Sequence, residues 1–151
     1  FEGIDNLIQD KASSNLTYMG TYDSPTDLPD LYGRVDMIWA CYPPPSDDPD
    51  WWWAQAVCRS NRFYESCFFR RPIITVSGSA DANVVSQYDI GLVMENQSPD
   101  GVEAAISSVN EHSLSRWKRN LKKIPRIVYE YSDEGKLLSD DIRHTLQTIS
   151  T

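Results

Sequence analysis

Histidine and cysteine are scarce in this chain of 151 residues, and neither is spaced as a metal site or a disulfide framework requires. The two histidines are isolated in the sequence, and the three cysteines include no C-x-x-C pair. An odd number of cysteines also disfavours a secreted scaffold stapled by disulfides. The sequence therefore predicts no bound metal, and reduced, buried thiols in a cytoplasmic protein.

Long apolar runs are also missing. The longest have five or six residues, as in Met37-Ile-Trp-Ala-Cys-Tyr42, whereas a helix that spans a bilayer needs about 20. No charged–apolar–small signal peptide is present either. We expect a cytoplasmic protein without a transmembrane segment. A basic stretch from Arg116 to Arg126 is typical of a solvated helix face, and contact with an anionic membrane surface is the alternative interpretation.

Positive charge is in the minority, with 14 Lys and Arg against 22 Asp and Glu and a net charge of −8. A field of that sign repels phosphate backbones, so we expect no nucleic-acid partner. The hydrophobic content of 40% can fill a core, and no linker or repeat divides the sequence. Residues 1–151 therefore predict a single domain. Because Phe1 opens directly on a helical stripe, we expect a fragment of a longer chain.

Helical and strand periods alternate along the sequence. The predicted strands cover residues 15–20, 36–42, 72–76 and 90–94, and the last three are near-continuous apolar runs typical of strands covered on both faces. Helical patterns stand between the strands, over residues 4–12, at the apolar face of Leu28, Leu31, Tyr32 and Val35, within 52–70 and over 80–88. Ser98-Pro99-Asp100 marks the start of another helix, and a final helix is predicted from residue 132 or 133. This alternation predicts the α/β class with a doubly wound, Rossmann-like parallel sheet. Ligands of such sheets bind at the carboxyl ends of the strands.

Motifs for nucleotide-binding glycine loops, serine nucleophiles and zinc proteases are absent from the sequence. A helix starting near Asn61 instead places Arg62 and Glu65 one turn apart on a polar face, beside a buried strand. A helix N-terminus with an arginine can bind an anion, and a carboxylate can accept bonds from paired hydroxyls such as those of ribose. On spacing alone, an ordinary Arg–Glu surface pair is the favoured interpretation.

Several segments, taken together and in order, favour a ligand site over an ordinary surface pair. They are Asn15-Leu-Thr-Tyr-Met-Gly20, Asp27-Leu-Pro-Asp-Leu-Tyr32 leading into Val35-Asp36, Asn61-Arg-Phe-Tyr-Glu65 followed by Arg71-Pro-Ile-Ile, Ser86–Val93 and Asp100–Val109. This order resembles the C-terminal donor-binding domain of retaining glycosyltransferases of the GT-B fold, family 4 type. The resemblance covers roughly residues 15 to 110. It implies one half of a GT-B architecture, with the N-terminal acceptor-binding domain missing from these residues.

The resemblance implies a role for each matching residue. Glu65 would hold the ribose hydroxyls of a nucleoside diphosphate sugar, and Arg62 would contact its diphosphate. Asn61 would add donors at the same helix start, and Gly20 would let a loop approach the donor closely. The chain departs from the family pattern at Val57, where an earlier glutamate is common, and at Arg70, where glycine is usual.

The implied activity is transfer of a sugar from the nucleotide donor to a glycan or lipid-linked acceptor in polysaccharide biosynthesis, without a cofactor. No catalytic residue is assigned, and the chain alone would bind donor without turnover. The alternative function is a non-catalytic nucleotide-binding module that acts with a separate partner subunit. Trp51-Trp-Trp53 is interpreted as packing against the core or a missing domain, with an aromatic platform for sugar rings as the alternative.

Overall fold

The computed structural model describes residue 17, residues 19–42 and residues 50–130. The chain divides into two compact units, Phe1–Gly33 and Arg34–Thr151. In the first unit, helix α2 (Leu28–Gly33) buries Leu28 and Tyr32, two residues of the apolar face that the sequence predicts. That residues 1–151 act as a single domain stays a prediction.

The predictions for the two ends of the chain fall mostly outside the described residues. Thr17, Met19 and Gly20 belong to the predicted strand 15–20, and none of the three is in a strand. The remaining residues of that segment lie outside the described ranges. So do the predicted helical segments 4–12 and 132 onward.

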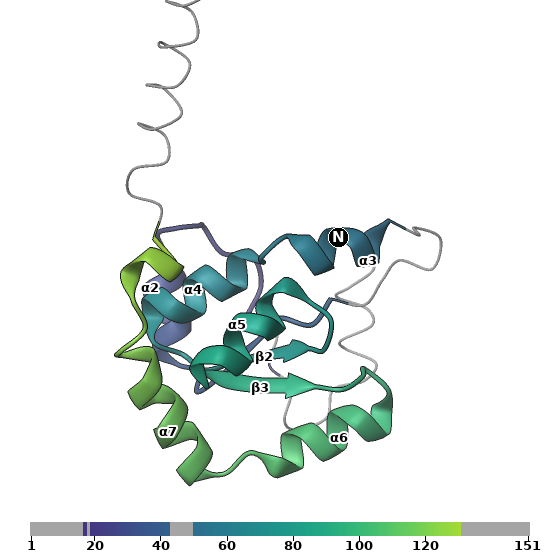
Figure 1. Ribbon diagram of the computed structural model, residues 1–151. Coiled ribbons are helices and arrows are strands. Elements are labelled where there is room, and N and C mark those ends of the chain that lie inside the picture. The colour runs from purple at the N-terminus through teal and green to yellow at the C-terminus, as the bar shows by residue number, and fades with distance from the viewer. Residues whose placement is uncertain (1–16, 18, 43–49, 131–151) are drawn as a thin grey trace, which may run out of the picture. The chain divides into compact units, whose positions relative to one another are not determined.

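The second unit contains a parallel sheet of three strands in the order β1-β2-β3 (Figure 1). The strands are β1 (Ile38–Trp39), β2 (Ile73–Val76) and β3 (Gly91–Met94). Both neighbouring pairs are parallel, which confirms the predicted pairing among these three apolar runs. The unit is therefore of mixed α/β type, and the doubly wound, Rossmann-like arrangement remains a prediction.

The register of the sheet explains one glycine. Gly91 of β3 lies opposite Ile73 of β2, and a Cβ atom at position 91 would overlap the carbonyl oxygen and backbone of Ile73. The two strands therefore approach each other more closely at this point than any side-chain-bearing residue would allow. Glycine is required here by packing, because its φ lies outside the left-handed region.

Helices connect and cover the strands. They are α3 (Trp51–Val57), α4 (Asn61–Phe69), α5 (Ala80–Tyr88), α6 (Pro99–Ser108) and α7 (Glu111–Leu121), followed by the short 3-10 turn η1 (Arg126–Val128). No helix within the described ranges is long and apolar enough to cross a bilayer.

Alternation along the strands sends neighbouring side chains to opposite faces of the sheet. Ile74 and Val76 of β2 form a buried cluster with Met94 of β3, and Val102 and Ala105 of α6 pack against it. On the other face α4 and α5 contact β2, and the fully buried Phe63, Cys67 and Val85 come from these two helices. Burial on both faces is the reason why these strands read as continuous apolar runs.

The predicted helical region 52–70 is two helices. Cys58 ends α3 in an extended conformation, and Ser60 is extended as well. The Ser60 side chain accepts a hydrogen bond from the backbone N–H of Phe63, so it starts a new helix as an N-cap. The predicted start of α6 is confirmed, because Ser98 caps the helix and Pro99 occupies its first turn.

Arg70 links α4 to the segment that follows α7. It ends α4 in the left-handed region with φ 58°, where most side chains are strained. Its guanidinium donates hydrogen bonds to the backbone oxygen of Leu121 at 2.5 Å and to the Tyr129 hydroxyl at 2.8 Å. The side chain thus supplies a long-range connection that the usual glycine at such a helix end would lack.

Candidate functional site

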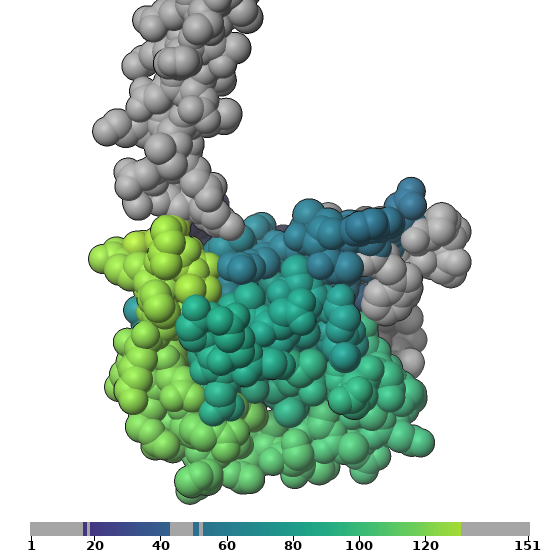
Figure 2. Space-filling model, viewed as in Figure 1, coloured from purple at the N-terminus to yellow at the C-terminus, as the bar shows by residue number. Residues whose placement is uncertain are grey.

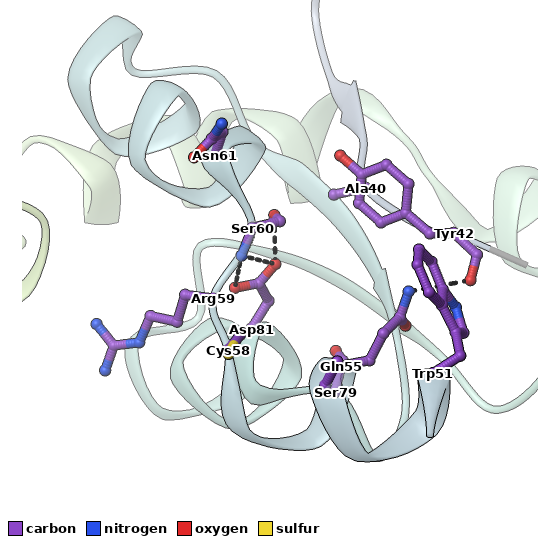
Figure 3. Close-up of a pocket in the computed structure, with 11 residues that line it drawn as sticks. Ala40, Tyr42, Trp51, Gln55, Cys58, Arg59, Ser60, Asn61, Ser79 and Asp81 are labelled. Carbon is purple, nitrogen blue, oxygen red and sulfur yellow. Dashed lines mark hydrogen bonds between the residues drawn. The ribbon is translucent and has the colours of Figure 1, made fainter. Parts of the chain in front are cut away.

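A cavity of about 350 Å³ lies in the second unit at the carboxyl ends of β1 and β2 (Figure 3). Its walls come from the residues after these strands, from α3, and from the first residues of α4 and α5. They are Ala40, Tyr42, Trp51, Ala54, Gln55, Cys58, Arg59, Ser60, Asn61, Ser79 and Asp81. This is the edge of the sheet where the sequence predicts a ligand.

Helix α3 supplies the aromatic wall. Gln55 donates its side-chain N–H to the backbone oxygen of Tyr42 at 3.2 Å, which fixes α3 to the end of β1. The indole Nε1 of Trp51 is buried, and it has no hydrogen-bond partner among the described residues. A buried N–H without an acceptor is costly, so this donor can serve a ligand that brings an oxygen into the cavity.

The floor of the cavity contains a buried carboxylate, Asp81 in the first turn of α5, which is 4% exposed. It accepts hydrogen bonds from the Ser60 hydroxyl at 2.6 Å and from the Ser60 backbone N–H at 3.2 and 3.3 Å, as the dashed lines in Figure 3 show. Burial raises the pKa of Asp81 above its usual value, and the hydrogen bonds from Ser60 oppose that rise. Asp81 therefore fixes the start of α4 against the start of α5.

Two helix N-termini meet at the cavity as a result. Ser60 caps α4, and Ser79 caps α5 by accepting a hydrogen bond from the backbone N–H of Ala82 at 3.2 Å. Ser60, Asn61 and Ser79 all line the cavity. The positive ends of the two helix dipoles favour a negatively charged ligand group in this place. Arg59 points away from the cavity (Figure 3) and donates to the backbone oxygen of Val128 at 2.9 Å.

The structure brings three of the four sequence-predicted donor residues together on the first turns of α4. Asn61 lines the cavity directly. Arg62 and Glu65 form an ion pair of 2.7 Å, with side chains 32% and 20% exposed. The pair itself does not distinguish the two interpretations, because a donor site and an ordinary helical ion pair both require Arg62 and Glu65 to lie close together. Their roles toward a donor stay a prediction.

Tyr42 connects this pair to the cavity. Tyr42 lines the cavity. Burial raises the pKa of its hydroxyl. Arg62 opposes that rise through its positive charge and through a hydrogen bond with the hydroxyl. Glu65 and Asp81 act on the same hydroxyl electrostatically. The polar face of α4 and the cavity are therefore adjoining parts of one site.

The fourth predicted residue, Gly20, belongs to the first unit. Its φ of +79° lies in the left-handed region, where glycine is strongly preferred. The contact of Gly20 with a donor stays a prediction.

The triple tryptophan splits between two environments. Trp51 lines the cavity, whereas Trp53 is 68% exposed on α3. Val57, one turn further along α3, is 58% exposed and does not line the cavity. Packing of this segment against the core or a missing domain, and its role as an aromatic platform for sugar rings, both stay predictions.

Sequence reasoning missed Asp81, Gln55 and Tyr42 as members of the site. The sequence contains one indication of a role for Asp81, which is its position two residues after Ser79 at a typical helix start. That position indicates only a favourable negative charge in the first turn of a helix. Its role toward Ser60 depends on a contact across 21 positions of sequence, which local patterns do not encode. Among the described residues, no three metal-ligating side chains lie together.

Comparisons with known proteins give one match of note. The chain is 30% identical over 95 residues to the succinoglycan biosynthesis protein ExoL of Rhizobium meliloti (strain 1021). These residues are 63% of this chain and 22% of that protein, so the match spans about a fifth of the relative's length. No family model matches the sequence.

Proposed function

We propose that this chain is the donor-binding part of a sugar transferase of polysaccharide biosynthesis, which takes a nucleoside diphosphate sugar as its donor. The observation that carries the proposal is the cavity between the N-termini of α4 and α5, with the Arg62–Glu65 pair beside it. The similarity to a succinoglycan biosynthesis protein supports the class of process. The retaining GT-B type rests on the resemblance of the motifs.

In the proposed complex, the diphosphate lies at the start of α4, within reach of Arg62 and of the backbone N–H groups of the first turn. Glu65 accepts hydrogen bonds from the two ribose hydroxyls, and Asn61 adds a donor or acceptor at the cavity wall. The sugar enters the cavity, where the unpartnered N–H of Trp51 meets one of its oxygens.

Binding would exchange the partners of the ion pair. A partly exposed Arg–Glu pair contributes about 0–1 kcal/mol, so it opens at little cost. The two groups then make charge-assisted bonds to the donor, Arg62 to phosphate oxygens and Glu65 to hydroxyls, which are stronger than neutral hydrogen bonds. The resting pair keeps both charges compensated while the site is empty.

The reaction breaks the bond between the anomeric carbon of the sugar and the diphosphate, and forms a bond from that carbon to an acceptor hydroxyl, whose proton is released. Arg62 and the α4 N-terminus would stabilise the negative charge that develops on the leaving diphosphate. The acceptor, a glycan or a lipid-linked sugar, would be held by an N-terminal domain of the full protein. Neither a cofactor nor a metal is part of this proposal.

Titration calorimetry with uridine, guanosine and adenosine diphosphates tests the donor site. Glu65→Gln should weaken nucleotide binding by about 10- to 100-fold, because it removes bonds to a charged group. Replacing ribose by deoxyribose should weaken binding to the native protein by a similar factor and to Glu65→Gln by little more. Arg62→Ala should penalise nucleoside diphosphates more than nucleosides.

The chain offers a matched control pair. Arg126 and Glu130 also form a helical-spacing ion pair, of 2.6 Å, far from the cavity in sequence. Arg126→Ala and Glu130→Gln should leave nucleotide affinity unchanged. If Arg62 and Glu65 variants behave like these controls, the pair is an ordinary surface interaction and the donor site is refuted.

A further inference from the structure

Helix α7 has two faces of opposite character. Trp117 and Leu121 are buried on one side, and Trp117 donates its indole N–H to Asp89 at 3.0 Å. Arg119 projects from the opposite side of the helix, Lys122 is the C-cap of the helix, and Lys123 follows it. All three are exposed. The helix is thus anchored by its apolar face, and the exposed cations at its C-terminal end, Arg119, Lys122 and Lys123, are here called the cationic face.

The cationic face remains after pairing is taken into account. From Arg116 to Glu130 the sequence has six basic residues and one acidic residue. Arg116 pairs with Asp89, Lys118 with Asp36 and Arg126 with Glu130, at 2.8, 2.8 and 2.6 Å. Arg119, Lys122 and Lys123 form no ion pair with any residue of the described ranges. Within the part of the chain that the structure describes, these three positive charges have no ion-pair partner, although the net charge of the whole chain is −8.

An exposed apolar side chain follows the last of these cations by four positions in the sequence. Ile127, in η1, is 82% exposed, the highest value among the large apolar side chains of the described ranges. Figure 2 shows the green and yellow-green segment of α7 and η1 as one continuous stretch along the side of the second unit. A cationic face followed by a projecting isoleucine is the combination that interfacial membrane contacts use.

We propose that the α7–η1 face, defined by Arg119, Lys122, Lys123 and Ile127, docks on an anionic lipid surface. Charge complementarity selects this occupant, since each cation near an anionic bilayer adds about fivefold to the affinity. At moderate salt, acidic residues that lie more than about 10 Å from the docked surface oppose docking only weakly, because their charges are screened. Ile127 inserts at the boundary between headgroups and acyl chains.

Two other roles would explain parts of the pattern. Basic residues near a helix C-terminus interact favourably with the helix dipole, which accounts for their position without any partner. A nucleic acid would also be attracted by the charge, but it gives no role to the exposed isoleucine and is repelled by the rest of the chain. The lipid surface accounts for both the cations and Ile127.

Docking of this kind would hold the proposed sugar transferase where lipid-linked acceptors are located. The proposal does not depend on the donor site, because its surface shares no residue with the cavity. Nucleotide binding and lipid binding can therefore fail or succeed separately.

Vesicle flotation with the 151-residue chain tests the proposal. The chain should float with vesicles of phosphatidylcholine and phosphatidylglycerol, and not with phosphatidylcholine alone, and high salt should release it. The triple variant Arg119→Gln, Lys122→Gln, Lys123→Gln should bind roughly 100-fold more weakly. Ile127→Ser should bind about tenfold more weakly, because it loses the inserted side chain. Circular dichroism checks that these surface variants fold.

A control variant removes the same charge elsewhere, with Lys11→Gln, Arg34→Gln and Arg143→Gln, and it should bind vesicles like the native chain. Equal loss in both triple variants would show that net charge alone acts and would overturn the docking face. Absence of flotation, or equal flotation with phosphatidylcholine alone, would overturn it as well. Tight binding of polyuridylic acid without vesicle binding would assign the face to nucleic acid instead.

Discussion

Asp81 is the residue whose replacement most directly tests the packing of the site. In the structure its carboxylate accepts hydrogen bonds from both the hydroxyl and the backbone N–H of Ser60. Asp81→Ala leaves these two donors without an acceptor at the base of the cavity. Each bond to a charged group contributes about 1.5–3 kcal/mol, and relief of carboxylate burial offsets part of the loss. The expected decrease in the free energy of unfolding is about 2–4 kcal/mol.

Asp81→Asn separates the hydrogen bonds from the charge. The amide oxygen can still accept one bond from Ser60, and the cost of burying a carboxylate disappears. Its free energy of unfolding at neutral pH should therefore lie within about 1 kcal/mol of the native value. A matched control is Asp100, which occupies the same first-turn position in α6 but is exposed. Asp100→Ala should cost only the helix-dipole interaction, about 0.3–1 kcal/mol.

The pH dependence gives a second, independent signature. Because burial raises the pKa of Asp81 above 3.8, the folded protein holds this proton more tightly than the unfolded chain does. The stability contributed by the group is present below the unfolded pKa and is lost as pH rises through the folded pKa. Asparagine does not titrate, so the difference in unfolding free energy, native minus Asp81→Asn, should fall with rising pH. The lowered pKa values of Asp36 and Glu130 act in the opposite direction, but they cancel in this difference.

Urea unfolding followed by the fluorescence of the five tryptophans measures these quantities at a series of pH values. Two results would refute the reasoning. One is an Asp81→Ala cost no larger than that of Asp100→Ala. The other is a native-minus-Asp81→Asn difference that rises with pH, which would mean that the folded state stabilises the ionised carboxylate.

Two further predictions concern the sheet and the thiols. Gly91→Ala should destabilise the protein by about 3 kcal/mol or more, because its Cβ would overlap the backbone of Ile73; thermal unfolding measures this, and a near-neutral effect would contradict the strand register. Burial raises the pKa of Cys41 to about 11 and of Cys67 to about 12, whereas Cys58 is exposed. Iodoacetamide at mildly alkaline pH should therefore modify Cys58 first, as read by mass spectrometry, and rapid labelling of the other two in native protein would show that they are accessible.

Elements with a strong local signal could be predicted from the sequence. The segments 72–76 and 90–94 are near-continuous apolar runs, and every residue of β2 is buried, as expected for a strand covered on both faces. The start of α6 follows from Ser98 and Pro99, whose cap and fixed φ act within one turn. The proximity of Arg62 and Glu65 follows from helical geometry alone.

The cavity could not be predicted in the same way. Its wall depends on Gln55 reaching the backbone oxygen of Tyr42 and on Asp81 reaching Ser60, contacts that join separate elements. The break between α3 and α4 shows the same limit, because the helical pattern of residues 52–70 continues through Ser60. Cys58 ends the first helix, and Ser60 starts the second as an N-cap whose hydroxyl also donates a hydrogen bond to Asp81.

Arg70 carries a consequence for how this chain can vary among its relatives. A glycine in its place would relax the left-handed backbone but would leave the Tyr129 hydroxyl and the Leu121 carbonyl without their donor. The aromatic ring of Tyr129 also packs against the guanidinium, at 5.3 Å. Relatives with glycine at position 70 should therefore lack the tyrosine at position 129, and those with arginine should retain it. Covariation between positions 70 and 129 would therefore show which relatives attach the segment after α7 through an arginine–tyrosine contact.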